Sequence, residues 1–186
     1  DADDVIGLRE PVKNDGYGPY NYEFLARSTK PKMVKDTQDG GFTSELLMHL
    51  LDIGDIQGAV LGDTYDDNPQ QGFQRLVRSS GDVMDCAGSR YTYSPNTVAL
   101  KEAMENDVKP IAVVGVPCQV NGVRQQQHSS IRMEVNKWYR NNISLTIGLF
   151  CSEAFTNESI TSIAKDYDVP LSDIENINIK GKVIVR

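Results

Sequence analysis

Short apolar runs alternate with segments of helical periodicity along most of this chain. Residues 111–116 and 143–150 are rich in apolar and β-branched side chains, and a cysteine follows closely after each run. Such runs, bounded by Pro, Gly or polar residues, are typical of buried strands. Residues 58–63 form a third run of this kind, and residues 22–26 and 74–79 predict two shorter strands. The chain therefore contains several strand-forming segments.

One helix is predicted directly from the spacing of leucines. Gly40 and Gly41 precede the leucines and are expected to open the helix, and Gly54 follows them and is expected to end it. Four apolar positions repeat at helical spacing between these glycines: Leu46, Leu47, Leu50 and Leu51.

Further helices are expected between the other strands. Ser94 and Pro95 predict the N-cap and the first turn of a helix over residues 97–106. Shorter helices are predicted near residues 82–87 and 120–127. Strands that alternate with helices are typical of α/β domains. We therefore predict an α/β fold, with a mixed, largely parallel sheet flanked by helices.

The two ends of the chain differ from its middle. Residues 1–22 carry Asp, Gly, Pro and Asn with little periodicity and predict a lead-in or linker. Residues 23–186 are expected to form one domain, since a chain of 186 residues with 39% hydrophobic residues can bury one sizeable core. The final segment, INIKGKVIVR, predicts the start of a strand or hairpin whose partner is absent. We therefore expect an N-terminal part of a longer protein, incomplete at its C-terminal end.

Composition excludes several classes of protein. A formal net charge of -7 argues against nucleic acid as a partner, because phosphate binding needs clustered Lys and Arg. No stretch approaches the roughly 18 apolar residues of a membrane span, and the N-terminal segment lacks the pattern of a signal peptide. Three cysteines are too few for a secreted disulfide framework. We expect a cytoplasmic protein.

Two cysteines occupy matching positions. Cys118 and Cys151 each follow a predicted buried strand, and the carboxyl ends of parallel strands share the edge of a sheet where ligands bind. On neighbouring strands, roughly 5 Å apart, the two thiols would lie close together and could ligate one metal centre. The alternative is that each is a small buried apolar side chain. Iron–sulfur clusters usually take more thiolates than these two, so the others would lie beyond Arg186. Cys86 is predicted to be a spectator.

Two polar segments suit a phosphate-containing ligand. Gln38, Gly40 and Gly41 precede a predicted helix, where free backbone N–H groups favour an anion, although an ordinary tight turn has the same pattern. The second segment places a cation and hydroxyls before another predicted helix, which suits a pyrophosphate and ribose, and its alternative is a capped helix with a solvated arginine. Its residues are Ser89, Arg90, Tyr91, Ser94, Pro95 and Asn96. These residues alone predict a cofactor-binding α/β domain.

Four segments, in this order and near this spacing, resemble the beta subunits of coenzyme F420 hydrogenase and dehydrogenase. They are KDTQDGGFTSELLMHLLDIGDIQGAV, AGSRYTYSPN, IAVVGVPCQVNGVRQQQ and ISLTIGLFCSEAF. The resemblance extends over about residues 24–186. It implies an oxidoreductase subunit that binds FAD, usually a 4Fe-4S cluster, and coenzyme F420. FAD in this family exchanges hydride with the deazaflavin and single electrons with the cluster.

The resemblance also implies roles for individual residues. Cys118 and Cys151 match two cluster ligands, and the remaining ligands are expected in a Cys-x-x-Cys segment beyond residue 186. No acid or base is implied as a catalytic group. The residues implied to bind FAD are Arg27, Ser28, Gln38, Gly40, Gly41, Thr43, Ser89, Arg90, Tyr91, Ser94, Pro95 and Asn96.

Several partners fit the resemblance. They are subunits of an F420-reducing hydrogenase, an F420H2 dehydrogenase or a formate dehydrogenase, or a fused ferredoxin-like domain as in an F420-dependent sulfite reductase. Membrane association would be peripheral and made through a partner. Two alternatives remain: a non-catalytic assembly module of the same fold, and a related ferredoxin-dependent reductase that acts on a chlorophyll-type substrate.

Overall fold

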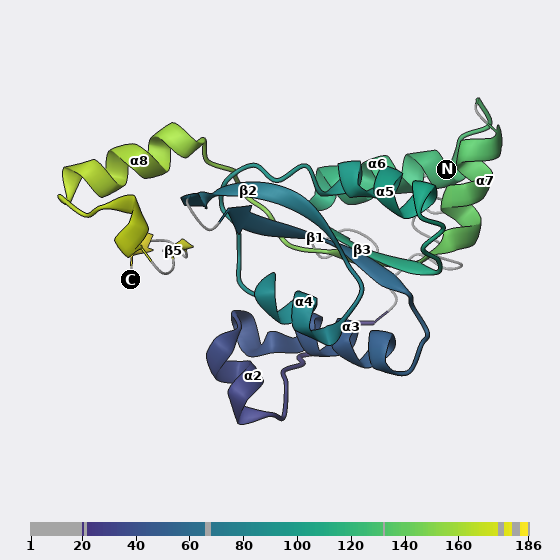
Figure 1. The fold of residues 1–186 in the computed structure, drawn as a ribbon, viewed down its shortest axis with the longest axis horizontal. Helices are drawn as coiled ribbons and strands as arrows, with labels where there is room; N and C mark the ends of the chain where they lie inside the picture. The colour runs from purple at the N-terminus through teal and green to yellow at the C-terminus, as the bar shows by residue number, and fades with distance from the viewer. Residues whose placement is uncertain are drawn as a thin grey trace.

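The computed structural model describes residue 20 and residues 22–65, 68–131, 133–174, 177–179 and 183–185. A four-stranded sheet with helices on both faces forms its centre (Figure 1). The strands of this sheet are β1 (Gly58–Tyr65), β2 (Asn68–Val77), β3 (Ile111–Gly115) and β4 (Ile143–Gly148). A separate two-stranded ribbon contains β5 (Ile177–Ile179) and β6 (Val183–Val185).

Helices connect the strands and cover the sheet. The α-helices are α2 (Pro31–Asp36), α3 (Phe42–Asp52), α4 (Ser80–Asp85), α5 (Ala99–Glu105), α6 (Pro117–His128), α7 (Met133–Asn142) and α8 (Asn157–Asp166). Three short 3₁₀ turns are η1 (Asp39–Gly41), η2 (Asn96–Val98) and η3 (Leu171–Asp173). Within the described ranges, every helix falls short of the length and apolar character that a bilayer crossing requires.

The sheet is mixed and largely parallel, as predicted. Its strand order is β2-β1-β3-β4. β1 and β2 pair antiparallel as consecutive strands, whereas β3 runs parallel to both β1 and β4. The register pairs Gly115 with Gly148 at the carboxyl ends of β3 and β4. The carboxyl ends of β1, β3 and β4 therefore share one edge of the sheet.

Alternating side chains of the central strands supply two hydrophobic clusters. Ala112 and Val114 face a cluster that includes Leu47 from α3 and Val83 from α4. Ile111 and Val113 face the opposite cluster, which α5, α6 and α7 complete. Figure 1 shows α3 and α4 on one side of the sheet and α5 to α7 on the other. β3 is therefore buried on both faces, which explains its continuous apolar sequence.

Two local predictions are wrong. Residues 22–26 form no strand, and the backbone over residues 22–28 is irregular. The aromatic and apolar side chains Tyr22, Phe24 and Leu25 are exposed there, so this stretch has no buried face to define a strand. Ser94 is not a helix N-cap, because η2 precedes α5 and no side chain caps either element. The predicted lead-in lies almost entirely outside the described residues.

Candidate functional site

The segment from Ala87 to Asn96 crosses from one face of the sheet to the other at the carboxyl edge. It leaves α4 on the first face and enters η2 and α5 on the second. Gln119, in the first turn of α6 after β3, donates from Nε2 to the Ser94 carbonyl oxygen at 2.6 Å. The backbone N–H of Phe155, beyond β4, donates to the Tyr91 carbonyl oxygen at 2.8 Å. These contacts hold the segment against the ends of the parallel strands.

The segments implied to bind FAD lie together in the structure. The backbone N–H of Ser28 donates to the Gly40 carbonyl oxygen at 2.8 Å. The side-chain oxygen Oε1 of Gln38 accepts a hydrogen bond from the backbone N–H of Ser89. Three stretches far apart in sequence, around Ser28, Gln38 and Ser89, are thus joined by hydrogen bonds. The structure therefore brings together the segments that sequence reasoning singled out separately.

Backbone conformation explains the two glycines in this region. Gly40 and Gly41 have φ values of 83° and 70°, which a residue with a Cβ atom adopts at a cost. A Cβ on Gly40 would lie 2.9 Å from the Cβ of Arg27, and a Cβ on Gly41 would collide with Oγ1 of Thr37. Gly41 is the N-cap residue of α3, and no side chain caps that helix. The α3 N-terminus therefore has unblocked backbone donors, and half-buried Thr43 lies in its first turn.

An ion pair lies beside the same helix. Glu45 of α3 pairs with Lys30, with Oε1 and Nζ 3.0 Å apart. The hydrogen bond from the Ser28 side chain, followed by that from Lys30, lowers the pKa of Glu45. Ser28 itself is buried, and its Oγ accepts a hydrogen bond from the Lys30 backbone N–H at 3.0 Å. Ser28 therefore fixes the local backbone, and Arg27 next to it is exposed.

Arg90 is a half-buried cation rather than a fully solvated one. Its side chain is 17% exposed, and its Nη1 donates to the Ala87 carbonyl oxygen at 3.1 Å. Nη2 lies 3.7 Å from Oδ1 of Asp63, beyond hydrogen-bond distance. Burial lowers the pKa of Arg90, although an arginine stays protonated in proteins. Nε is buried and has no hydrogen-bond partner within the described part of the chain. This arrangement fits an anionic ligand that accepts from the guanidinium.

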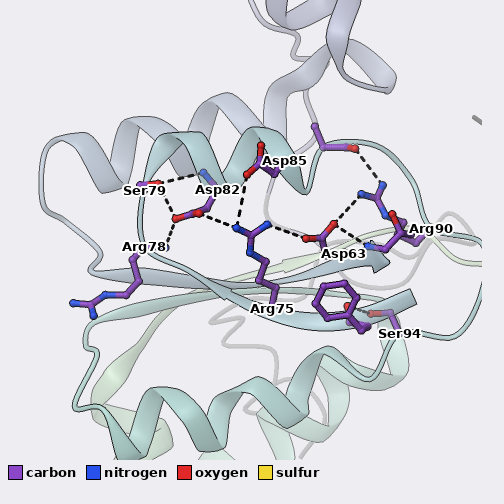
Figure 2. Close-up of polar contacts among 11 residues, drawn as sticks. Asp63, Arg75, Arg78, Ser79, Asp82, Asp85, Arg90 and Ser94 are labelled. Atoms are coloured by element: carbon purple, nitrogen blue, oxygen red, sulfur yellow. Dashed lines mark hydrogen bonds and ion pairs between the residues drawn. The ribbon is translucent and has the colours of Figure 1, made fainter. Parts of the chain in front are cut away.

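Sequence reasoning missed Asp63, which lies beside Arg90, and the charged residues that pair with Asp63. Asp63 on β1 and Arg75 on β2 form an ion pair, with Oδ2 and Nη1 2.9 Å apart. Arg75 Nη2 also donates to Asp82 Oδ1 of α4 at 2.9 Å. Figure 2 shows Arg75 and Arg90 approaching Asp63 from opposite sides. The available signal was weak: Asp63 ends one predicted strand, and Arg75 is one of two arginines within the other.

The end of the crossing segment packs against the sheet instead of facing outward. Asn96 is buried, and its Nδ2 donates to the Val114 carbonyl oxygen at 3.0 Å. Oγ of Ser94 lies 2.9 Å from the Phe73 carbonyl oxygen and 2.5 Å from Oδ1 of Asn96. Pro95 is the N-cap residue of η2. Tyr91 packs against the small apolar cluster beneath α8. Ser94 and Asn96 thus anchor the segment in this structure.

Cys118 and Cys151 occupy equivalent positions after neighbouring strands. Each lies three residues beyond one of the paired glycines, Gly115 and Gly148, and the backbone N–H of Leu149 donates to the Gly115 carbonyl oxygen at 2.9 Å. Both cysteines are exposed, so the alternative that they are buried apolar side chains is wrong. The described residues contain no cluster of three or more His, Cys, Asp or Glu that could hold a metal. That the two thiols share a centre stays a prediction.

Cys86 has a different environment. It is buried in the cluster beneath α3 and α4. Burial, together with the nearby Asp63 carboxylate, raises the pKa of its thiol to about 12. The thiolate, which is the reactive form, is therefore scarce at neutral pH. These observations agree with its predicted role as a spectator.

We expect two of the three thiols to react quickly with a thiol reagent and the third to react slowly. With an aromatic disulfide reagent at pH 8, and in protein that holds no cluster, Cys118 and Cys151 should react within minutes because they are exposed. Cys86 should react only after denaturant unfolds the protein, because folding both buries it and raises its pKa. The measurement is the number of thiols released with time. Three fast thiols in the native protein would contradict the buried position of Cys86.

The fold and the position of the site define an open α/β domain whose candidate ligand region lies beyond the carboxyl ends of the strands. Residues 24–101 match the N-terminal part of the family described as "Coenzyme F420 hydrogenase/dehydrogenase, beta subunit". Residues 108–186 match the C-terminal part of the same family. The chain belongs to this family of beta subunits.

Individual relatives of this chain carry names that refer to coenzyme F420. The chain is 32% identical over 174 residues to "Coenzyme F420 hydrogenase subunit beta" of Methanosarcina barkeri, covering 92% of this chain and 58% of that protein. It is 37% identical over 154 residues to a subunit of the F(420)H(2) dehydrogenase of Methanosarcina mazei, covering 83% and 39%. It is also 31% identical over 157 residues to "Coenzyme F420-dependent sulfite reductase" of Methanocaldococcus jannaschii, covering 80% and 25%. The chain thus spans no more than 58% of the length of these relatives.

A solved structure supports the fold. A chain of the F420-reducing [NiFe] hydrogenase complex from Methanosarcina barkeri superposes with a TM-score of 0.76 at 33% identity. The match covers 86% of this chain and 54% of that one. The predicted α/β architecture is therefore confirmed both by the strand pairing and by a related structure.

Proposed function

We propose that this chain is part of an oxidoreductase subunit that binds FAD and exchanges hydride with coenzyme F420. Electrons would pass between the flavin and a partner through an iron–sulfur cluster. The observation that carries the proposal is the hydrogen-bonded convergence of the segments around Ser28, Gln38 and Ser89 at one end of the sheet. Membership of a family named for coenzyme F420 hydrogenase and dehydrogenase supports the choice of cofactor and substrate.

The chain's own residues would bind and orient the flavin. Backbone N–H groups at the α3 N-terminus, opened by Gly41, suit a phosphate group. Arg90 offers a half-buried cation whose buried Nε–H has no partner among the described residues. Bound FAD would supply the conversion between hydride and single-electron transfer. No side chain needs to act as an acid or base, so we expect binding and orientation to be the main tasks of this region.

Cys118 and Cys151 are proposed as two ligands of the cluster. Both are exposed, and both follow strands that pair directly with one another. Thiolates are the ligands that iron–sulfur clusters require, and a full set exceeds the two that this edge offers. Additional ligands would therefore have to come from another segment of the protein or from a partner.

Replacing Arg90 by alanine is expected to weaken FAD binding about tenfold, the effect of losing one charge-assisted hydrogen bond. The fold should survive, because Asp63 keeps its 2.9 Å ion pair with Arg75. The dissociation constant can be measured by titrating the purified variant with FAD and following the quenching of flavin fluorescence.

A matched control removes a cation elsewhere. Lys101 forms an exposed i,i+4 pair with Glu105 on α5, so Lys101→Gln changes the net charge equally at a site remote from the crossing segment. We expect native FAD affinity in this control. Equal FAD affinity in the Arg90→Ala variant and the native protein would contradict the proposed contact.

An absorption spectrum of the anaerobically purified protein tests the function as a whole. Flavin bands with a broad iron–sulfur shoulder, and bleaching of the flavin by reduced F420, are the expected result. A colourless protein after reconstitution with FAD, iron and sulfide would instead support the non-catalytic assembly module. A bound flavin that is not bleached by reduced F420 would favour the alternative reductase of the same fold.

A further inference from the structure

Two arginines share the carboxylate of Asp63 unequally. Arg75 Nη1 lies 2.9 Å from Oδ2, whereas Arg90 Nη2 lies 3.7 Å from Oδ1. Oδ1 already accepts the backbone N–H of Thr64 at 2.8 Å. Asp63 is buried, and these two hydrogen bonds engage both of its oxygens. The shortest contacts of Asp63 are therefore with Arg75 and with the backbone of Thr64, and its contact with Arg90 is longer.

Contacts from α4 hold Arg75 in this position. Its Nη2 donates to Asp82 Oδ1 at 2.9 Å and lies 3.7 Å from Asp85 Oδ2. Asp82 is fixed in turn, since the Ser79 hydroxyl donates to its Oδ2 at 2.7 Å and its backbone N–H donates back to Ser79 Oγ at 3.2 Å. Figure 2 shows this line of alternating charges from α4 to Asp63. Hydrogen bonds to Asp63 on one side and to Asp82 on the other therefore fix the Arg75 guanidinium.

The consequence for Arg90 is unused hydrogen-bonding capacity. A guanidinium carries five N–H donors, and among the described residues Arg90 donates a hydrogen bond of 3.1 Å to the Ala87 carbonyl oxygen. Nε is buried without a partner in the described part of the chain. Were Arg75 missing, Arg90 would be the cation left beside Asp63 in the described part of the chain, and a carboxylate and a guanidinium form a strong bidentate pair when geometry allows.

We propose that Arg75 is a positioning residue: by occupying Asp63, it keeps the guanidinium of Arg90 available for an anionic phosphate group of the bound dinucleotide. The inference rests on the proposed function, because it assumes that Arg90 contacts FAD. Arg75 itself makes no contact with the ligand in this scheme. Its effect is transmitted through Asp63, so the effect should vanish when Asp63 loses its charge.

A pair of variants tests this dependence. In Arg75→Gln, Asp63 should draw Arg90 into a direct ion pair, and FAD affinity should fall about tenfold, the loss expected for one charge-assisted hydrogen bond. Adding Asp63→Asn removes the competing carboxylate. The double variant should then regain native FAD affinity to within about twofold, less than the effect of one ordinary hydrogen bond. The measurement is fluorescence titration with FAD, with Lys101→Gln as the charge-matched control.

Thermal unfolding without FAD separates positioning from damage to the fold. If Arg75 were merely structural, the double variant would bind FAD as weakly as Arg75→Gln, and the proposal would be overturned. If Arg75→Gln does not fold, Arg75→Lys provides a milder substitution, because it keeps the cation. Native FAD affinity in Arg75→Lys would support the proposal. A tenfold loss of FAD affinity in Arg75→Lys that Asp63→Asn does not rescue would overturn it. Unchanged FAD affinity in Arg90→Ala would reject the proposed FAD contact. A weakened Arg90→Ala beside an unaffected Arg75→Gln would reject only the positioning role.

Discussion

A Cys118→Ser protein is expected to lose electron exchange with its partner while bound flavin is still reduced by reduced F420. Hydride transfer needs only contact between the two ring systems, whereas onward transfer of single electrons needs the cluster as a relay. Serine has nearly the size of cysteine but is a poor ligand for iron. Because Cys118 is exposed at the second position of α6, its replacement should leave the hydrophobic clusters intact.

Two assays on one preparation distinguish the outcomes. The first follows anaerobic bleaching of the flavin by reduced F420, and the second follows turnover with the physiological partner or a one-electron dye. Cys86→Ala is the matched control, because that thiol is buried in the cluster beneath α3 and α4, whereas Cys118 is exposed. Loss of both activities with flavin still bound would place Cys118 at the flavin. Retention of both would remove Cys118 from electron transfer.

The central sheet could be predicted because its strands are buried in a way that composition reveals. β3 packs against both hydrophobic clusters, so all of its side chains are apolar and no other element fits so short a run. By contrast, α7 was not predicted. Its apolar contacts come from Trp138 and Tyr139 among polar residues, and its buried Asn136 bonds to Gln126 of α6. A polar residue buried by a specific partner gives no periodic signal.

The candidate site could be predicted only where a residue type by itself reveals the local structure. Gly40 and Gly41 are visible in the sequence because positive φ angles favour glycine. The pairing of Asp63 with Arg75 depends on β-strand register, which places them two positions apart diagonally on one face, and no local pattern specifies that register. Ser94 was assigned wrongly because a Ser-Pro pair suits an N-cap, yet here its side chain packs against β1 and β2, with Oγ 2.9 Å from the Phe73 carbonyl oxygen.

Replacing Gly41 by alanine should lower both stability and FAD affinity. A left-handed backbone costs an L-residue roughly 1–2 kcal/mol, and overpacking adds typically 1–3 kcal/mol, because the new Cβ would collide with Thr37 Oγ1 and lie 3.2 Å from the Met33 carbonyl oxygen. Thr37 cannot yield easily, since its hydroxyl donates to that same carbonyl at 2.5 Å. We expect a total loss of about 3 kcal/mol from these two terms.

Gly54→Ala isolates the steric part of this prediction. Gly54 also has a positive φ, 79°, but nothing lies within 4 Å of the added Cβ, so that variant should lose only the backbone cost of roughly 1–2 kcal/mol. For a chain of this size each kcal/mol lowers Tm by about 2–4 °C, which makes the difference measurable by circular dichroism. Titration with FAD should then show weaker binding for Gly41→Ala alone, because only that substitution displaces the start of α3 beside Gln38. If both variants lost the same amount of Tm and both kept native FAD affinity, Gly41 would serve the turn and not the cofactor.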